Sequence, residues 1–366
     1  MATQANNKRV TAKQQETKKR RKIIIFVVEI LIILIMVAVL WLVMEKTPEG
    51  PSVTVLDPEE LEIHEDVQLA REEGGTMHGY VNIALFGVDA EKESQLYKGS
   101  RSDSIMIASI NLDTGEIKLV SVYRDSYLNI GTDEYRKCNA AYSFGGAEQA
   151  VKMLNMNLDM DIEHFITVGY KGLSEVIDGL GGVWIDVDSE ELRHINNYQI
   201  SIAETLKCDY IPVKEAGYQL LDGLQATAYC RIRYTSGDDF KRTARQREVI
   251  QAIEDQAKQA DLATLTKVFN NAINDIYTNV DVETIMTFLE DITTYKIVDE
   301  GGFPQESMRT VANIGAKGSS VIPLDLESNV VWLHQFLFDD ADYTVTDSVR
   351  EYSQKIASDT AAYINK

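Results

Sequence analysis

An apolar run of 22 residues near the N-terminus constrains the fold of this chain more than any other feature. It extends from Ile23 to Met44 and contains one charged residue, Glu29. A helix rises about 1.5 Å per residue, so this run can span the roughly 30 Å hydrocarbon core of a bilayer. Signal peptides have shorter apolar cores, and no small-residue cleavage site follows here. The sequence therefore predicts one transmembrane signal-anchor helix over residues 23–44.

Charge is distributed unevenly on the two sides of this run. Residues 1–22 contain eight lysines and arginines and one acidic residue, so they carry +7, whereas the whole chain carries −21. Basic segments beside a transmembrane helix stay in the cytoplasm. We therefore expect a cytoplasmic tail over 1–22 and an extracytoplasmic body over 45–366, a single-pass type II arrangement in the plasma membrane. The 344 residues after the tail then carry −28, which disfavours nucleic acid as a partner.

Glu29 has two interpretations. An acidic residue inside the membrane can mark a helix partner or a proton relay. Glu29 is also only two turns from the cytoplasmic end of the apolar run, where its carboxylate can reach the headgroups. A carboxylate that only reaches the headgroups has no specific function. A role as a helix partner or proton relay remains open.

The body divides into three parts by composition. Residues 45–78 are polar and acidic and contain three prolines, as expected of a stalk. Residues 79–345 alternate apolar strand patterns with helical ones, which predicts an α/β domain with a central sheet covered by helices on both sides. Residues 346–366 are predicted to form a polar, weakly helical tail.

Individual elements can be placed within the domain. Strands are predicted over 80–87, 104–112, 116–124, 164–170 and 183–187. Helices are predicted over 145–159, 171–182, 221–233, 240–259, 262–273 and 282–292. The segment Asp113-Thr114-Gly115 predicts a hairpin turn between the second and third strands.

Cysteine and histidine give little functional information. The three cysteines, Cys138, Cys208 and Cys230, are too few for a disulfide scaffold, although any two of them could form one bridge in an oxidising compartment. None lies in a C-x-x-C motif, and the five histidines are scattered, so a zinc site is not expected.

Arginines and aspartates gather at the ends of the predicted elements. Asp89 follows the first strand, Arg101 and Asp103 precede the second, and Arg124 and Asp125 close the third. Further along, the chain contains Arg231, Arg233, Asp239, Lys241, Arg242, Arg245, Gln246 and Arg247. The arginine fork donates two parallel hydrogen bonds to phosphate, and two adjacent carboxylates can hold Mg²⁺. The pattern predicts phosphoryl transfer, and its alternative is a set of surface ion pairs on a solvated helix.

The order of several motifs resembles the LytR-CpsA-Psr (LCP) family of bacterial cell-wall enzymes. The matching segments are Gly87-Val88-Asp89, Arg101-Ser102-Asp103-Ser104, Tyr123-Arg124-Asp125, Asn139-Ala140-Ala141-Tyr142, Asp178-Gly179-Leu180-Gly181-Gly182-Val183, Leu221-Asp222-Gly223, Arg231-Ile232-Arg233 and Asp239 through Arg247. They cover about residues 80–253. The resemblance implies an α-β-α domain with a central mixed sheet.

The resemblance also implies a function. Such enzymes move a glycopolymer, for example teichoic acid or capsular polysaccharide, from a polyprenyl-pyrophosphate carrier onto peptidoglycan through a phosphodiester bond. The implied cofactor is Mg²⁺, with Mn²⁺ as an alternative. By match to the motifs, Asp89 and Asp103 would bind the metal. The pyrophosphate would be bound by Arg101, Arg124, Arg231, Arg233, Arg242 and Gln246, and catalysis is assigned to Arg124, Asp103 and Arg242.

The family's prenyl chain lies in an apolar tunnel between sheet and helices. The candidates for its lining here are Ile105, Ile107, Val120, Val122 and Phe165, which could equally be core residues. Strand alternation places Arg124 on the same face as Val120 and Val122, at the mouth of such a tunnel.

Several points remain open at this stage. Tyr123 and Lys241 differ from the residues common in the family, and either Asp125 or Asp239 could be the general base. Two other functions are compatible with the motifs: hydrolysis of a polyprenyl pyrophosphate without transfer, and an envelope-sensing role in transcriptional attenuation. Direct DNA binding is not expected, because residues 1–22 are too short for a DNA-binding fold.

Overall fold

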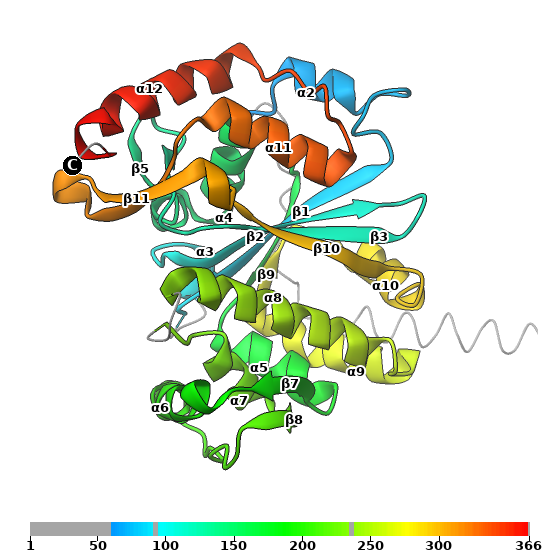
Figure 1. Ribbon diagram of the computed structural model, residues 1–366. Helices are drawn as coiled ribbons and strands as arrows, with labels where there is room; N and C mark the ends of the chain where they lie inside the picture. The colour runs from blue at the N-terminus through cyan, green and yellow to red at the C-terminus, as the bar shows by residue number, and fades with distance from the viewer. Residues whose placement is uncertain (1–59, 91–93, 234–237, 365–366) are drawn as a thin grey trace, which may run out of the picture. The chain divides into compact units, whose positions relative to one another are not determined.

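The computed structural model describes residues 60–90, 94–233 and 238–364, which belong to one compact unit. Its centre is a six-stranded sheet in the order β10-β3-β2-β1-β6-β9 (Figure 1). The strands are β1 (Tyr80–Val88), β2 (Ser102–Asn111), β3 (Glu116–Val122), β6 (His164–Val168), β9 (Ile276–Thr278) and β10 (Lys296–Phe303). β1 pairs antiparallel with β2 and parallel with β6, and β3 pairs antiparallel with β2 and parallel with β10. The predicted α/β class with a central mixed sheet is confirmed.

Helices cover both faces of this sheet (Figure 1). One face carries α4 (Ala140–Leu158), α11 (Leu326–Phe338) and α12 (Asp347–Ile364). The other face carries α5 (Tyr170–Gly179), α8 (Asp238–Ala257) and α9 (Leu262–Ala272), with α6 (Ser189–Leu206) and α7 (Gly223–Tyr229) farther out. Three short helices are α2 (Glu65–Ala70), α3 (Ser94–Tyr97) and α10 (Val282–Glu290). The two-stranded pairs are β4 (Tyr127–Asn129) with β5 (Tyr135–Lys137), β7 (Val183–Val187) with β8 (Gly217–Leu221), and β11 (Arg309–Asn313) with β12 (Ser319–Pro323).

Two separate apolar clusters stabilise these layers. The larger one joins inward residues of the sheet, such as Phe86 and Val120, to Leu154 of α4 and Leu333 of α11. The smaller one lies on the opposite side of the sheet, within the group α5–α8 with β7 and β8. Because each face of the sheet is covered, its strands are apolar on both sides.

Local sequence signals account for several element boundaries. At the turn after β2, the Asn111 side chain accepts hydrogen bonds from the backbone N–H groups of Asp113 (3.0 Å) and Thr114 (3.1 Å), and Gly115 has a φ of +72° that favours glycine. Asp222 begins α7 with a complete capping box, in which its carboxylate accepts from the N–H of Gln225 at 2.8 Å. The turn was predicted from sequence, whereas the helix predicted over 221–233 is shorter in the structure and ends at Tyr229.

The structure differs from the sequence prediction at both ends of the domain. Leu61, Ile63, Val67 and Met77, in the predicted stalk, are buried in the larger apolar cluster. The predicted polar tail is instead the 18-residue helix α12, which buries Val349 and Ile356 against the same cluster. Its apolar residues are few but spaced along one face, so composition alone underestimated its packing.

Some predictions fall on residues that the structure does not describe. Residues 1–22, the transmembrane helix predicted over 23–44 and Glu29 lie outside the described ranges. Within the described ranges, no helix is long and apolar enough to cross a membrane. The disulfide question is answered, because Cys138, Cys208 and Cys230 are all free thiols.

Candidate active site

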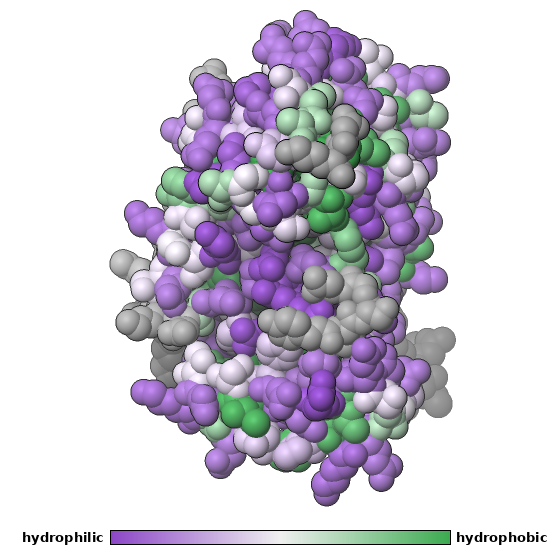
Figure 2. Space-filling model, turned by 60° about the vertical axis from the view of Figure 1, so that its left-hand side comes forward, coloured by the Kyte–Doolittle hydropathy of each residue, from purple (hydrophilic) through white to green (hydrophobic). Residues whose placement is uncertain are grey.

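A cavity of about 950 Å³ lies between the sheet and the helices α5 to α8. All eight residues assigned to the site from sequence contribute to its wall: Asp89, Arg101, Asp103, Arg124, Arg231, Arg233, Arg242 and Gln246. Strongly hydrophilic side chains gather at the centre of the face shown in Figure 2. Segments more than 100 residues apart in the chain therefore meet around one cavity, as the motif pattern predicted.

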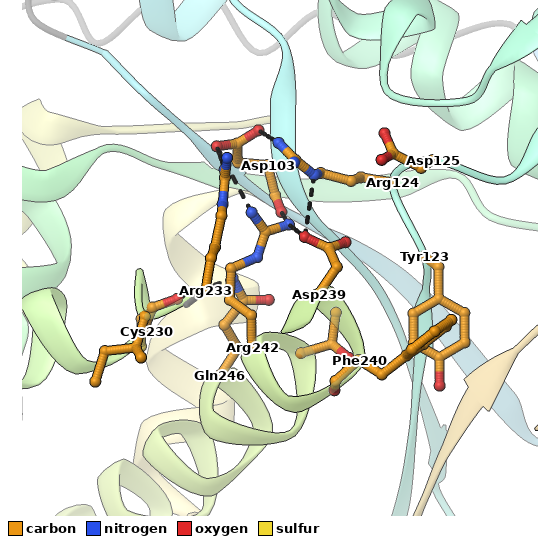
Figure 3. A network of polar contacts seen from close by, with 12 residues as sticks. Asp103, Tyr123, Arg124, Asp125, Cys230, Arg233, Asp239, Phe240, Arg242 and Gln246 are labelled. Carbon is orange, nitrogen blue, oxygen red and sulfur yellow. Dashed lines mark hydrogen bonds and ion pairs between the residues drawn. The ribbon is translucent and has the colours of Figure 1, made fainter. Parts of the chain in front are cut away.

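Asp103, the second residue of β2, is the centre of the polar end (Figure 3). One carboxylate oxygen accepts a hydrogen bond from Nη1 of Arg124 at 2.6 Å, and the other accepts from Nη2 of Arg233 at 2.6 Å. The backbone carbonyl of Asp103 accepts from Nη2 of Arg242 at 2.8 Å. One aspartate thus organises three arginines that come from the segment after β3, from α8 and from the segment after α7.

Asp239, in the first turn of α8, contacts two of the same arginines. Its Oδ1 atom lies 3.0 Å from Nη2 of Arg242 and 3.3 Å from Nε of Arg124. Asp125 lies beside Arg124 but forms its ion pair with Lys137 at 3.2 Å instead (Figure 3). Asp239 therefore braces the arginine cluster, whereas Asp125 stays outside it.

The charges in this network oppose one another. Burial disfavours ionisation of Asp103, but the charges of Arg124, Arg242 and Arg233 outweigh this effect, so its pKa is lowered. Burial lowers the pKa of Arg242 to about 10, because its side chain is only 1% exposed. Two of its guanidinium nitrogens, Nε and Nη1, have no hydrogen-bond partner in the part of the chain that the structure describes. A buried guanidinium with unused donors is suited to bind an anion.

Asp89 and Arg231 form a second part of the polar end. Asp89 follows β1, and its carboxylate accepts a hydrogen bond from the hydroxyl of Tyr170. It also lies 3.9 Å from Nη2 of Arg231, whose guanidinium packs over the ring of Tyr170. Asp89 is half exposed, so its carboxylate remains open to the cavity.

The remaining predicted ligands lie at the edges of the polar end. Arg101 precedes β2 and is exposed on the rim of the cavity. Gln246 of α8 donates a 3.4 Å hydrogen bond to the backbone carbonyl of Cys230, and its side-chain oxygen is buried without a partner among the described residues.

Two arginines of the α8 motif have structural roles. Arg245 pairs with the buried Glu191 at 2.6 Å. Arg247 donates to the hydroxyl of Ser121 at 2.7 Å and lies 3.3 Å from Glu300. Both residues form ion pairs, as the alternative interpretation held, but they are buried and do not lie on a solvated surface.

The carboxylates on the cavity wall fit Mg²⁺ in their chemistry. Mg²⁺ is bound through one or two carboxylates together with phosphate oxygens and water. Asp103 is ionised and Asp89 is open to the cavity. Among the described residues, no group of three or more His, Cys, Asp or Glu side chains could hold a metal by itself. In a site with one or two carboxylates, phosphate oxygens and water supply the other ligands of Mg²⁺.

The rest of the cavity wall is apolar. It is lined by residues such as Leu85, Met106, Ile166, Val249, Ile253 and Ile276. None of the five predicted tunnel residues contributes: Ile105, Ile107, Val120, Val122 and Phe165 all belong to the larger core on the opposite side of the sheet. The sequence prediction chose the wrong face, since Leu85 pairs with Met106 on the cavity side and Ile107 pairs with Val120 on the core side. Both faces are apolar, so alternation could not distinguish them.

The prediction that Arg124 lies at the cavity is correct, but the strand alternation from which it was made does not apply. Its guanidinium lies at the cavity, although Val120 and Val122 point to the opposite side. β3 ends at Val122, so the two-residue alternation does not continue as far as Arg124.

Sequence reasoning missed two tyrosines on the cavity wall. Tyr170 begins α5 directly after β6, so the strand-end criterion that selected Asp89 could have selected it. Tyr198 lies within α6, a helix that was not predicted, and nothing in its sequence context marks it.

Together, the fold and the site define an α/β protein in which an arginine cluster and an apolar wall line one cavity. A sequence profile of the LytR_cpsA_psr family matches residues 55–320, and this chain belongs to that family. The family resemblance predicted from the motifs is therefore confirmed.

Named relatives and solved structures agree with this assignment. A polyisoprenyl-teichoic acid–peptidoglycan teichoic acid transferase, TagU of Oceanobacillus iheyensis, is 32% identical over 238 residues, or 60% of this chain and 68% of the relative. TagU of Halalkalibacterium halodurans is 30% identical over 198 residues, or 53% of this chain and 59% of the relative. The structure of TagT bound to LIIa-WTA has a TM-score of 0.53 and 21% identity, and the match covers 79% of this chain and 94% of that one. The structural likeness shows a shared fold. The chain spans 59% and 52% of the length of the first two curated relatives.

Proposed function

We propose that this protein is a phosphotransferase that moves a glycopolymer from a polyprenyl-pyrophosphate carrier onto peptidoglycan through a phosphodiester bond. One observation carries the proposal: a cluster of arginines and an apolar wall share one cavity of about 950 Å³. A prenyl pyrophosphate has the same two halves, an apolar chain and a dianionic or trianionic head. The names of the TagU relatives, which are teichoic acid transferases, support the same chemistry.

The arginines would act on charge that develops during transfer. The acceptor hydroxyl attacks the phosphorus that carries the glycan and gives up its proton. The bond to the bridging oxygen breaks, so that polyprenyl phosphate leaves with the electron pair of that bond. Arg124, Arg233 and Arg242 are already held by Asp103 and Asp239, so they need little reorganisation as negative charge builds on the leaving phosphate. Arg101, Arg231 and Gln246 would bind the outer oxygens of the pyrophosphate.

Asp89 and Asp103 would hold Mg²⁺ between the protein and the pyrophosphate. Bound Mg²⁺ polarises phosphoryl oxygens and neutralises part of their charge. Asp103 would then have two functions, since it also fixes the positions of Arg124 and Arg233.

The location of the substrates agrees with the topology predicted from sequence. Peptidoglycan and the exported, lipid-linked glycopolymer lie outside the plasma membrane. We propose that residues 23–44 span the bilayer, with residues 1–22 in the cytoplasm and the domain outside, where both substrates are available.

The decisive experiment measures transfer directly. The purified full chain is incubated with a polyprenyl-pyrophosphate-linked glycan, radiolabelled in the glycan, and with purified peptidoglycan in the presence of Mg²⁺. We expect label in the insoluble wall fraction, bound through a phosphodiester that mild acid hydrolyses. We also expect polyprenyl phosphate as the second product. Release of soluble glycan phosphate without labelled wall would indicate hydrolysis and contradict the proposal. A chain with Arg242→Gln serves as the control for label that is only adsorbed.

A further inference from the structure

Two tyrosine rings surround the guanidinium of Arg231. Its central carbon lies 4.4 Å from the ring centroid of Tyr170 and 5.3 Å from that of Tyr198. Both distances are within the range in which a cation is attracted to the face of an aromatic ring. Tyr170 comes from α5 and Tyr198 from α6, whereas Arg231 follows α7. The contacts therefore join three helices at the wall of the cavity.

Arg231 is held differently from the neighbouring arginines. Arg124 and Arg233 each form a 2.6 Å ion pair with Asp103, and Arg242 pairs with Asp239 at 3.0 Å. For Arg231, the only carboxylate within 4.0 Å in the described parts of the chain is Asp89, at 3.9 Å. Its side chain also donates a long hydrogen bond, 3.4 Å, to the hydroxyl of Ser201. The aromatic rings, rather than acidic groups, therefore fix its position.

This difference matters for anion binding. A guanidinium in a short ion pair must share its donors between the carboxylate and a ligand. A guanidinium held by ring faces keeps its N–H donors free in its own plane, where a phosphate can accept them. Arg231 is 27% exposed and faces the cavity, so these donors are accessible to a ligand there.

Tyr170 has a second contact at this site, with the carboxylate of Asp89. Its hydroxyl donates to the carboxylate of Asp89 while its ring lies over Arg231. The side chain of Tyr170 thus fixes the positions of both Arg231 and Asp89, although these two residues form no short ion pair with each other.

We propose that Tyr170 and Tyr198 are positioning residues that present Arg231 to the pyrophosphate of the substrate through their ring faces. The inference rests on the proposed function, because it assumes a prenyl pyrophosphate in the cavity. Restricting Arg231 before binding reduces the side-chain entropy that is lost on binding. The rings should therefore contribute to affinity for the pyrophosphate without touching it.

The test compares ring removal with ring retention at position 198. Binding of farnesyl pyrophosphate to the purified full chain is measured by calorimetry in EDTA, so that no metal contributes. Tyr198→Leu should weaken binding by about 5- to 30-fold, the range expected for loss of a partly buried cation–π contact. Tyr198→Phe keeps the ring and should bind within about 2-fold of wild type. Tyr218→Leu, at a tyrosine that is 70% exposed on β8 and does not line the cavity, is the matched control and should have no effect.

A double-variant cycle separates positioning from a general structural role. If Tyr198 acts through Arg231, Tyr198→Leu should have little further effect once Arg231→Ala has been introduced. An equal loss in both backgrounds would overturn the inference, because the ring would then act by another route. Thermal melting of each variant checks folding, and Tyr198→Met, unbranched and of similar bulk, replaces Tyr198→Leu if that variant does not fold.

The hydroxyl and the ring of Tyr170 can be separated in the same assay. Tyr170→Phe removes the hydrogen bond to Asp89 but keeps the ring, so binding in EDTA should stay within about 2-fold of wild type. Tyr170→Leu removes both and should weaken binding like Tyr198→Leu. If Tyr170→Leu and Tyr198→Leu both bind farnesyl pyrophosphate as tightly as the wild type, this inference is overturned but the proposed function is not. Absence of farnesyl pyrophosphate binding by the wild type would overturn the proposed function as well.

Discussion

Replacing Asp103 by asparagine tests whether one carboxylate holds the arginine cluster together. Asp103→Asn keeps the size of the side chain but removes the charge that Arg124, Arg233 and Arg242 surround. Asparagine retains one acceptor oxygen, so one of the two 2.6 Å hydrogen bonds to a guanidinium is lost and the other is weakened. A hydrogen bond to a charged group contributes about 1.5 to 3 kcal/mol, and the remaining cations would repel one another. We expect the free energy of unfolding to fall by about 2 to 4 kcal/mol at pH 7.

Urea unfolding followed by circular dichroism measures this loss, and its pH dependence identifies the cause. The pKa of Asp103 is lowered in the folded protein from its usual value of 3.8. The stabilisation is therefore fully present above that value and is lost as the pH falls below it. The difference between wild type and Asp103→Asn should be constant from about pH 5 to pH 8 and should shrink below about pH 4.

Two controls make this prediction specific. Asp89→Asn makes the same chemical change at a half-exposed residue that lies 3.9 Å from Arg231. It should lower the free energy of unfolding by less than about 1 kcal/mol. Inorganic pyrophosphate added in EDTA should stabilise Asp103→Asn more than wild type, since the anion would replace the missing charge. Equal stability of Asp103→Asn and wild type, or a difference that persists undiminished at pH 3, would refute the reasoning.

Three further outcomes test the catalytic site, the metal and the topology. Arg124→Lys keeps the charge but loses the planar fork. Turnover should therefore fall by about 100-fold, whereas the affinity for farnesyl pyrophosphate should change by less than about 5-fold. Near-normal turnover would exclude a catalytic role for Arg124. Asp89→Ala should need far more Mg²⁺ for transfer than wild type, and wild-type transfer that survives EDTA would contradict the metal proposal. Protease added outside intact protoplasts should degrade residues 45–366 and spare residues 1–22; protection of the body would contradict the type II topology.

Sequence patterns were most informative where chemistry and turn geometry coincide. Asp89, Asp103 and Arg124 could be found because polar residues at strand ends tend to face a site rather than a core. The capping box at Asp222 and the turn after Asn111 were likewise predictable, because each depends on residues close in sequence. These features need no knowledge of the tertiary arrangement.

Features that depend on distant packing could not be predicted. Met106 and Ile107 are apolar neighbours on β2, yet Met106 lines the cavity and Ile107 belongs to the core. Only the positions of α4 and α8 on opposite faces decide between them. Tyr198 shows the same limit, since its partner Arg231 is more than 30 residues away and lies outside α6, after the end of α7. The division of Asp125 and Asp239 between two different ion pairs was also inaccessible to sequence.

The edge strand β10 has a consequence for the order in which the molecule folds. It pairs with β3, and the backbone N–H of Tyr123 donates to the carbonyl of Phe303 at 2.9 Å. One edge of residues 116–122 therefore stays unpaired until residues 296–303 have been synthesised and have docked. Contacts between segments so far apart form slowly, and β3 meanwhile exposes unpaired backbone groups that can recruit another chain. A product that stops soon after the last shared motif, near residue 253, would contain every proposed ligand of the pyrophosphate. In that product β3, the strand that leads to Arg124, would keep β2 but lack β10. We therefore expect such a product to aggregate and to show no transfer activity.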